Sequence, residues 1–151
     1  MDLEGIVNKL KRNFPQAVLE ATTFREEFTL RLRAEDLLEV CRFLRDDPEL
    51  SFHFLTDLCG VDRYPAEPRF EVVYHLCAMK TKERLRLKVF LQGESPRLPS
   101  AFSIWKAADW LEREAYDMFG ITFTGHPDLR RILLTPDWEG HPLRKDYPLR
   151  G

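Results

Sequence analysis

The sequence predicts an α+β fold: a two-layer sandwich of a mixed or antiparallel sheet with helices, followed by an extended C-terminal strap. Some segments alternate apolar and polar residues, as strands do, and others repeat apolar residues at helical spacing. The two kinds of segment do not alternate strictly along the chain, as a doubly wound parallel sheet would require. We therefore expect an α+β domain over residues 1–120 and a partner-binding segment, called the strap, over residues 121–151.

The first part of the chain predicts a helix, a hairpin and a second helix. Apolar residues at helical spacing from Leu3 onward predict a short helix that ends before Pro15. Residues 17–23 and 27–33 predict a β-hairpin, because apolar and polar side chains alternate in its second strand. The second helix is expected to begin at Ala34, with acidic residues in its first turn, where the helix dipole favours them.

The middle of the chain predicts three strands. Residues 51–57 indicate one strand, which leads to a loop around Gly60 and Asp62. Residues 69–79 and 84–91 alternate apolar and polar side chains over their whole length and predict the clearest hairpin. A segment rich in proline and serine then separates this hairpin from the last helix.

The last helix is expected over about residues 104–119, with Gly120 at the position that a C-terminal glycine favours. Its charges suggest that Arg113 pairs with Asp109 and Asp117, each one turn away. The expected apolar face consists of Ala107, Trp110, Leu111, Ala115, Met118 and Phe119.

The stretch GHPDLRRILLTPDWEGHPLRKDYPLRG, residues 125–151, combines prolines with large apolar side chains. The prolines exclude a long helix, and the apolar anchors distinguish the stretch from a disordered tail. We expect an extended ribbon whose side chains are buried against another surface, partly that of a partner protein. The anchors are Leu129, Ile132, Leu133, Leu134, Trp138, Leu143, Tyr147 and Leu149.

Composition narrows the class of protein. With 23 basic and 25 acidic residues, the chain lacks the positive charge of a nucleic-acid-binding protein.

No apolar run approaches the roughly 18 residues that span a bilayer, and the N-terminus has no signal-peptide core, so we expect a cytoplasmic location. Cys41, Cys59 and Cys77 lack paired spacing and lie in apolar segments, which predicts buried reduced thiols rather than disulfides or cluster ligands.

The sequence shows no self-contained active site. His126 and His141, with nearby acids, could suggest a metal site, but they lie 15 residues apart without a helix to align them. His75 falls inside a strand and is expected to be a satisfied structural histidine. Asp57 and Asp62 could act as paired carboxylates, although loop capping is the simpler role. We expect no catalytic, cofactor-binding or metal-ligating residue in this chain.

The segment WLEREAYDMFG, followed by the strap, resembles the 30-kDa subunit family of respiratory complex I, the bacterial NADH-quinone oxidoreductase. The N-terminal part is similar to the same family more loosely, through FLTDLCGVD at 54–62 and EVVYHL at 71–76. The residues that match the family's motif are Glu112, Arg113, Glu114, Asp117, Gly120, His126, Arg130, Ile132 and Leu133.

The resemblance implies a subunit of the hydrophilic arm that binds no cofactor itself. FMN and iron–sulfur clusters would belong to partner subunits, which pass electrons from NADH to quinone with coupled proton translocation. It implies docking on the 49-kDa-type subunit, with the strap running over that neighbour, on the cytoplasmic side of the inner membrane. Many family members continue past the DYPLRG segment with which this chain ends.

The candidate interface residues lie on the last helix and the strap. They are Glu112, Arg113, Asp117, His126, Asp128, Arg130, Arg131, Trp138, Glu139, His141, Arg144, Lys145, Asp146 and Tyr147.

Two other functions remain open at this point. The chain could be the equivalent subunit of an energy-converting hydrogenase, a formate hydrogenlyase or an F420-type dehydrogenase, which use similar subunits. It could also be a stand-alone metal hydrolase that uses His126, His141 and the surrounding acids.

Overall fold

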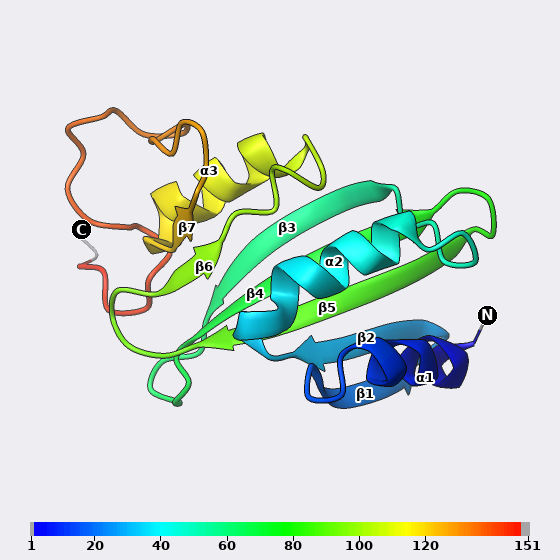
Figure 1. Cartoon of the computed structure of the whole chain (residues 1–151). Helices are drawn as coiled ribbons and strands as arrows, with labels where there is room; N and C mark the ends of the chain where they lie inside the picture. Colours follow the sequence, from blue (N-terminus) through cyan, green and yellow to red (C-terminus); the bar gives the residue numbers. More distant parts are fainter. Residues whose placement is uncertain (1, 149–151) are drawn as a thin grey trace.

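The computed structural model describes residues 2–148, so the expected anchor Leu149 lies outside the described residues. Figure 1 shows a sheet with helices, and a long C-terminal segment beside the last helix. The elements are α1 Leu3–Asn13, β1 Val18–Phe24, β2 Glu27–Leu32, the 3-10 helix η1 Ala34–Asp36, α2 Leu37–Asp46, β3 Phe54–Asp62, β4 Phe70–Ala78, β5 Glu83–Leu91, β6 Arg97–Pro99, α3 Ala108–Phe119 and β7 Thr122–Thr124.

The main sheet has the strand order β1-β2-β5-β4-β3. β1–β2, β3–β4 and β4–β5 are antiparallel pairs. β2 and β5 run parallel, and the connection between them contains α2, β3 and β4. The mixed sheet and the α+β class that the sequence predicts are thereby confirmed. α2 lies across one face of the sheet (Figure 1).

The core lies on the face that carries α2. Alternate residues of β5, and the matching residues of β4, point into it, and Val72, Tyr74, Leu87 and Val89 are completely buried. Each such side chain contributes roughly 1.5–3 kcal/mol when it leaves water. The opposite face of these strands carries Arg84, Arg86 and Lys88 in β5, as the alternation in the sequence predicts, and we call it the open face of the sheet.

β3 differs from the sequence prediction. The strand runs over Phe54–Asp62, and Gly60 lies inside it rather than in a loop. Its register with β4 shifts between Leu55 and Asp57, so Thr56 is the extra residue of a β-bulge. A Cβ at Gly60 would lie 2.7 Å from the Phe119 side chain, so only glycine lets α3 pack this closely against the strand.

The last helix also differs in its bounds and its buried face. α3 begins at Ala108, and the short parallel pair β6–β7, which the sequence did not predict, lies before and after it. Trp110 is 58% exposed, whereas Glu112 and Asp117 are completely buried. The expected apolar face was therefore partly wrong, because buried carboxylates here take positions that apolar residues usually occupy.

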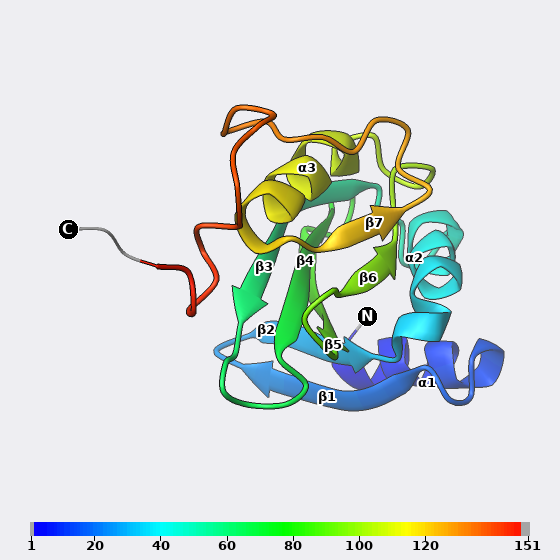
Figure 2. The same cartoon turned by 90° about the vertical axis from the view of Figure 1, so that its left-hand side faces the viewer.

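Figure 2 shows how the strap continues from β7 and passes around α3. α3 lies next to β3, at the edge of the sheet opposite β1. The strap therefore reaches the C-terminal end of α3 and the end of β3, and these two places carry most of its hydrogen bonds with the domain.

Candidate partner-binding surface

The strap caps the C-terminal end of α3. The last four carbonyls of a helix have no partner inside the helix and need donors from elsewhere. Here all four have one, and the strap supplies donors to three of them. The bonds are Gly120 N to Tyr116 O at 2.7 Å, Arg131 Nη1 to Asp117 O at 3.1 Å, His141 Nδ1 to Asp117 O at 3.0 Å, Leu143 N to Met118 O at 3.0 Å, and Arg144 Nε to Phe119 O at 2.7 Å.

Asp117 is the main anchor for the strap. Its Oδ1 accepts from Arg131 Nη1 at 2.6 Å, and its Oδ2 accepts from three successive backbone N–H groups of the strap. Burial opposes ionisation of this carboxyl, but Arg131 and the three N–H donors hold its pKa below the usual range. The three donors are Ile132 N at 3.2 Å, Leu133 N at 2.8 Å and Leu134 N at 2.9 Å.

Gly120 lets the strap approach the helix end. Its φ of +76° is the left-handed conformation that ends many helices, and a Cβ there would lie 2.6 Å from His141 Cδ2 and 2.8 Å from Arg144 Nη2. Burial, followed by the nearby Arg131 and Arg144 charges, lowers the pKa of His141 despite its bond to Asp117 O. The lowered pKa favours the neutral imidazole, whose Nδ1 donates to Asp117 O.

A second anchor joins the strap to the end of β3. Asp62 and Arg69 form a buried bidentate ion pair at 2.9 and 2.8 Å. Asp146 adds a 2.9 Å contact to Arg69 Nη2, and the Lys145 backbone N–H donates to Asp62 Oδ2 at 2.8 Å. The bond from Arg69 holds the pKa of Asp62 well below its usual range. The role of Arg69 could not be seen in the sequence, because its partners lie 7 and 77 positions away.

Glu112 lies on the other side of α3 and contacts the segment after β6. Its Oε1 lies 2.5 Å from Ser100 Oγ, and its Oε2 accepts from Ala101 N at 2.7 Å. Burial raises the pKa of Glu112 to about 7, although both hydrogen bonds favour the ionised form. Glu112 therefore positions α3 from inside the domain and is not a surface contact for a partner.

His126 is also a structural residue. Its Nδ1 accepts from Asp128 N at 2.9 Å, so the proton lies on Nε2, which is 3.1 Å from both the backbone oxygen and Oδ1 of Asp109. His141 bonds to Asp117 instead, so the two histidines bind different carbonyls of α3. Neither belongs to a group of three convergent ligand side chains among residues 2–148.

Arg113 does not form the two ion pairs expected from the sequence. Its Nε and Nη2 instead donate to the backbone oxygens of Arg130 and Arg131, at 3.3 and 3.5 Å. Asp109 contacts His126 and Asp117 contacts Arg131, so tertiary contacts replace the pairs within the helix.

The outward side of the strap carries large apolar side chains among exposed charged residues such as Arg130, Glu139 and Lys145. Leu133, Trp138 and Leu143 are 53%, 43% and 54% exposed, and Trp110 of α3 adds a further exposed aromatic ring. Leu143 also borders a groove of about 320 Å³ that α3 and β3 line together. Several polar groups of the strap thus bind this chain, whereas several of its large apolar side chains remain in contact with solvent.

The other candidate interface residues fall into two groups. Tyr147 is half-buried, and its ring packs against Gly140, where a Cβ would lie 2.9 Å from it. Glu139 is exposed, and Arg130 and Asp128 form a surface ion pair at 2.9 Å. Surface pairs of this kind contribute little stability.

An α+β fold of this kind is shared with a family of oxidoreductase subunits. Residues 30–151 match the family described as respiratory-chain NADH dehydrogenase, 30 Kd subunit. The chain belongs to this family, and it is a subunit of a multisubunit assembly of the complex I type.

Curated relatives are named as a subunit of NADH-quinone oxidoreductase. The protein from Roseiflexus castenholzii (strain DSM 13941 / HLO8) is 50% identical over 149 residues, which cover 99% of this chain and 86% of the relative. The protein from Citrifermentans bemidjiense is 52% identical over 145 residues, covering 96% and 89%. The resemblance stated from the motif residues is thereby confirmed.

Two solved structures share the fold. A trypsin-resistant fragment of Nqo5 superposes with a TM-score of 0.70 at 31% identity, covering 85% of this chain and all of the fragment. A chain of the membrane-bound sulfane sulfur reductase, an archaeal respiratory membrane complex, gives a TM-score of 0.81 at 26% identity, covering 97% and 85%. Within residues 2–148, no helix has the length and apolar character needed to cross a bilayer.

Proposed function

We propose that this chain is a peripheral-arm subunit of a proton-translocating NADH:quinone oxidoreductase and that it docks on the 49-kDa-type subunit through the outward side of its strap. It carries no active site and binds neither FMN nor an iron–sulfur cluster. Those groups belong to partner subunits, which pass electrons from NADH to quinone on the cytoplasmic side of the membrane.

One observation carries the docking proposal: polar groups hold the strap on the domain, and the large apolar side chains of Leu133, Trp138 and Leu143 remain exposed. Hydrogen bonds to Asp117 fix the backbone at Leu133, so the exposed Leu133 side chain is presented on an ordered support. Pre-ordered apolar and aromatic anchors are typical of binding hot spots, because little side-chain and backbone freedom is lost on association. Trp110 and Trp138 supply the aromatic rings that such interfaces favour.

The cysteines support the proposed absence of an iron–sulfur cluster. Cys41 is completely buried, and burial raises the pKa of its thiol far above neutral pH. Cys59 and Cys77 are half-buried on strands, so the expectation that all three thiols are buried was wrong for these two. Three cysteines on separate elements do not form the four-thiolate set of an iron–sulfur cluster.

Purification of the native assembly through a tag on this chain tests the proposal. We expect the 49-kDa-type subunit to co-purify with the wild-type chain and to be depleted in the Trp138→Ala variant. Phe24→Ala is the matched control, because Phe24 is an exposed aromatic residue on β1, at the opposite edge of the sheet. Equal recovery with both variants, or NADH oxidation by the isolated chain, would refute the proposal.

A second candidate follows from the likeness to the sulfane sulfur reductase chain. The same fold and strap would then serve the equivalent position in another membrane-bound respiratory complex, such as an energy-converting hydrogenase, a formate hydrogenlyase or an F420-type dehydrogenase. The purification above separates the two candidates, because NADH- and FMN-binding subunits accompany the chain only in the first. For the stand-alone hydrolase, His126 and His141 provide no shared ligand site.

A further inference from the structure

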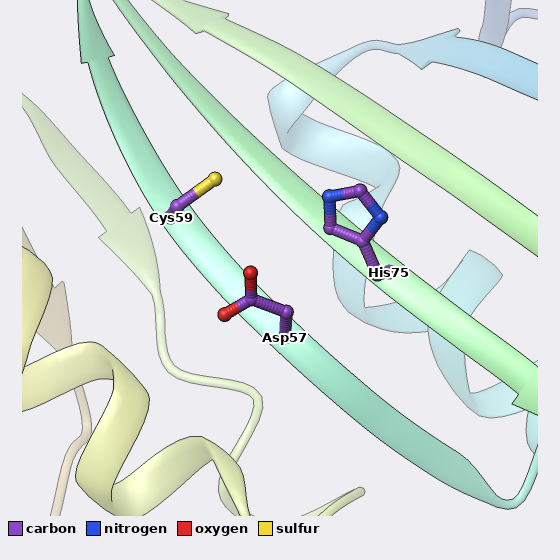
Figure 3. Close-up of side chains that lie close together, drawn as sticks. All are labelled: Asp57, Cys59 and His75. Carbon is purple, nitrogen blue, oxygen red and sulfur yellow. The ribbon is translucent and has the colours of Figure 1, made fainter.

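The open face of the sheet brings together three side chains that bind metals well. Asp57 and Cys59 come from β3, and His75 comes from the neighbouring strand β4 (Figure 3). One ligand atom of each residue, a carboxylate oxygen, the Sγ and an imidazole nitrogen, lies within 4.8 Å of the other two. All three lie on the side of the sheet away from α2. Asp57 and Cys59 border the groove that Leu143 of the strap also lines, whereas the strap is anchored at Asp117, Asp62 and Arg69.

The bulge at Thr56 creates this cluster. Successive strand residues point to opposite faces, so without a bulge Asp57 and Cys59 would share the buried face with Leu55. The register moves by two residues on β3 and by one on β4, from Leu55–Leu76 to Asp57–His75. Asp57 is therefore the direct cross-strand neighbour of His75, and Cys59 follows two residues later on the same face. Bulges are known to redirect side chains in this way.

The donor set fits a zinc ion. Zinc accepts thiolate, imidazole and carboxylate ligands in tetrahedral geometry, at bond lengths of about 2.0–2.3 Å. Ligand atoms around such an ion are about 3.5 Å apart, so small side-chain rotations from the present separations of up to 4.8 Å would close the site. Three protein ligands with a water molecule in the fourth position is the pattern of an open zinc site.

The surroundings leave the cluster accessible and balance its charge. Asp57 and His75 line a cleft of about 370 Å³ on the open face, which gives an ion a path from solvent. Arg86, the neighbour of His75 on β5, is paired with Glu27 at 2.7 Å, so its charge is partly neutralised. Asp57 Oδ1 accepts from Leu58 N at 2.9 Å, which orients the carboxylate and leaves Oδ2 available.

We propose that Asp57, Cys59 and His75 bind one zinc ion that ties β3 to β4 at the bulge. Binding displaces the thiol proton of Cys59, which leaves as H⁺ when the sulfur–zinc bond forms. The fourth ligand is a water molecule. This inference is independent of the docking proposal, since its test uses the isolated chain and needs no partner subunit.

Metal titration of the full chain, purified without a histidine tag and stripped with a chelator, tests the site. We expect one zinc ion per chain, and we expect cobalt in its place to give the charge-transfer absorption of a thiolate ligand. Cys59→Ser should abolish that absorption and weaken zinc binding by at least about tenfold, and His75→Gln and Asp57→Asn should weaken binding by a similar factor.

Cys77→Ser is the matched control. Cys77 is also half-buried, lies on the same face of β4 and lines the cleft, but it is outside the convergent group. This variant should keep both the stoichiometry and the thiolate absorption. Circular dichroism checks that every variant is folded. Absence of stoichiometric zinc in the folded wild type would overturn the proposal, as would a cobalt–thiolate absorption that survives Cys59→Ser.

Discussion

Asp117 and Arg131 form a buried ion pair, with 2.6 Å between Oδ1 and Nη1, that joins the last helix of the domain to the strap. The same guanidinium also donates to Asp117 O and, through Nη2, to Gly140 O at 2.8 Å. One arginine therefore links the helix end to two points of the strap. Because these bonds hold the strap through polar groups, the large side chains of Leu133, Trp138 and Leu143 stay exposed on an ordered backbone.

Replacing Asp117 should release the strap. Asp117→Asn removes the charge that Arg131 faces and sets amide hydrogens against backbone N–H donors, so we expect a loss of about 3 kcal/mol in unfolding free energy. Asp128→Asn is the matched control, because the Asp128–Arg130 pair is exposed, and it should cost less than about 1 kcal/mol. Urea denaturation measures both, and equal stabilities would show that Asp117 is not the anchor.

Comparing Gly120 and Gly125 separates the cost of a left-handed backbone from the cost of a steric clash, because the two have nearly the same φ. Gly120 and Gly125 have φ of +76° and +80°, but an added Cβ meets His141 only at Gly120 and nothing within 4 Å at Gly125. Gly125→Ala should lower the free energy of unfolding by only roughly 1–2 kcal/mol, the cost of the left-handed conformation for a residue with a Cβ. Gly120→Ala should cost clearly more and increase proteolysis within the strap. Similar costs would contradict the packing of the strap on the helix end.

Arg69 pairs with one buried and one exposed carboxylate, and the two pairs should contribute differently to stability. It pairs with Asp62, whose side chain is 1% exposed, and with Asp146, whose side chain is 50% exposed. Asp62→Asn should therefore cost about 3–5 kcal/mol, because it leaves the buried guanidinium poorly compensated, and Asp146→Asn less than about 1 kcal/mol. Thermal or chemical unfolding measures both variants, and the reverse order would refute this assignment.

Glu112 should make stability depend on pH. Its pKa rises from 4.5 to about 7 on folding, so between these values the folded state binds more protons than the unfolded state. The stability contribution of the protonated carboxyl therefore falls as pH rises through this window. Glu112→Gln should match the wild type near pH 4 and exceed it by about 3 kcal/mol near pH 8. Denaturation at both pH values, showing the same difference at each, would contradict the raised pKa.

Local patterns predicted most of the fold. The alternation of apolar side chains in β4 and β5 placed both strands close to their observed bounds, and helical spacing from Leu3 located α1. Turn chemistry was less informative. The β1–β2 turn places Arg25 and Glu26 at φ of 50° and 67° without a glycine, so only the flanking strands indicated the hairpin.

The remaining features depend on contacts between distant parts of the chain. The burial of Glu112 requires Ser100 and Ala101, and the burial of Asp117 requires the strap, so neither follows from helical periodicity. The bulge at Thr56 changes which face Asp57 occupies, and no turn residue marks it. The strap was correctly predicted to be non-helical, but its attachment to its own domain was not foreseen, because opposite charges on one chain do not reveal their partners.

Point variants test the docking surface better than truncation does. Deleting the strap would also expose the carbonyls of α3 and the Asp117 carboxylate, so lost binding could reflect an altered domain. Leu133 and Leu19 offer a matched comparison, since both leucines are 53% exposed and Leu19 lies on β1, away from the strap.

The affinity of the purified 49-kDa-type subunit for these two variants tests the central claim most directly. Leu133→Asp should weaken binding by at least about tenfold, because it places a charge in the apolar centre of the interface, whereas Leu19→Asp should leave the Kd within about twofold of wild type. Equal affinities of the two variants for the 49-kDa-type subunit would show that the outward side of the strap is not where the partner binds.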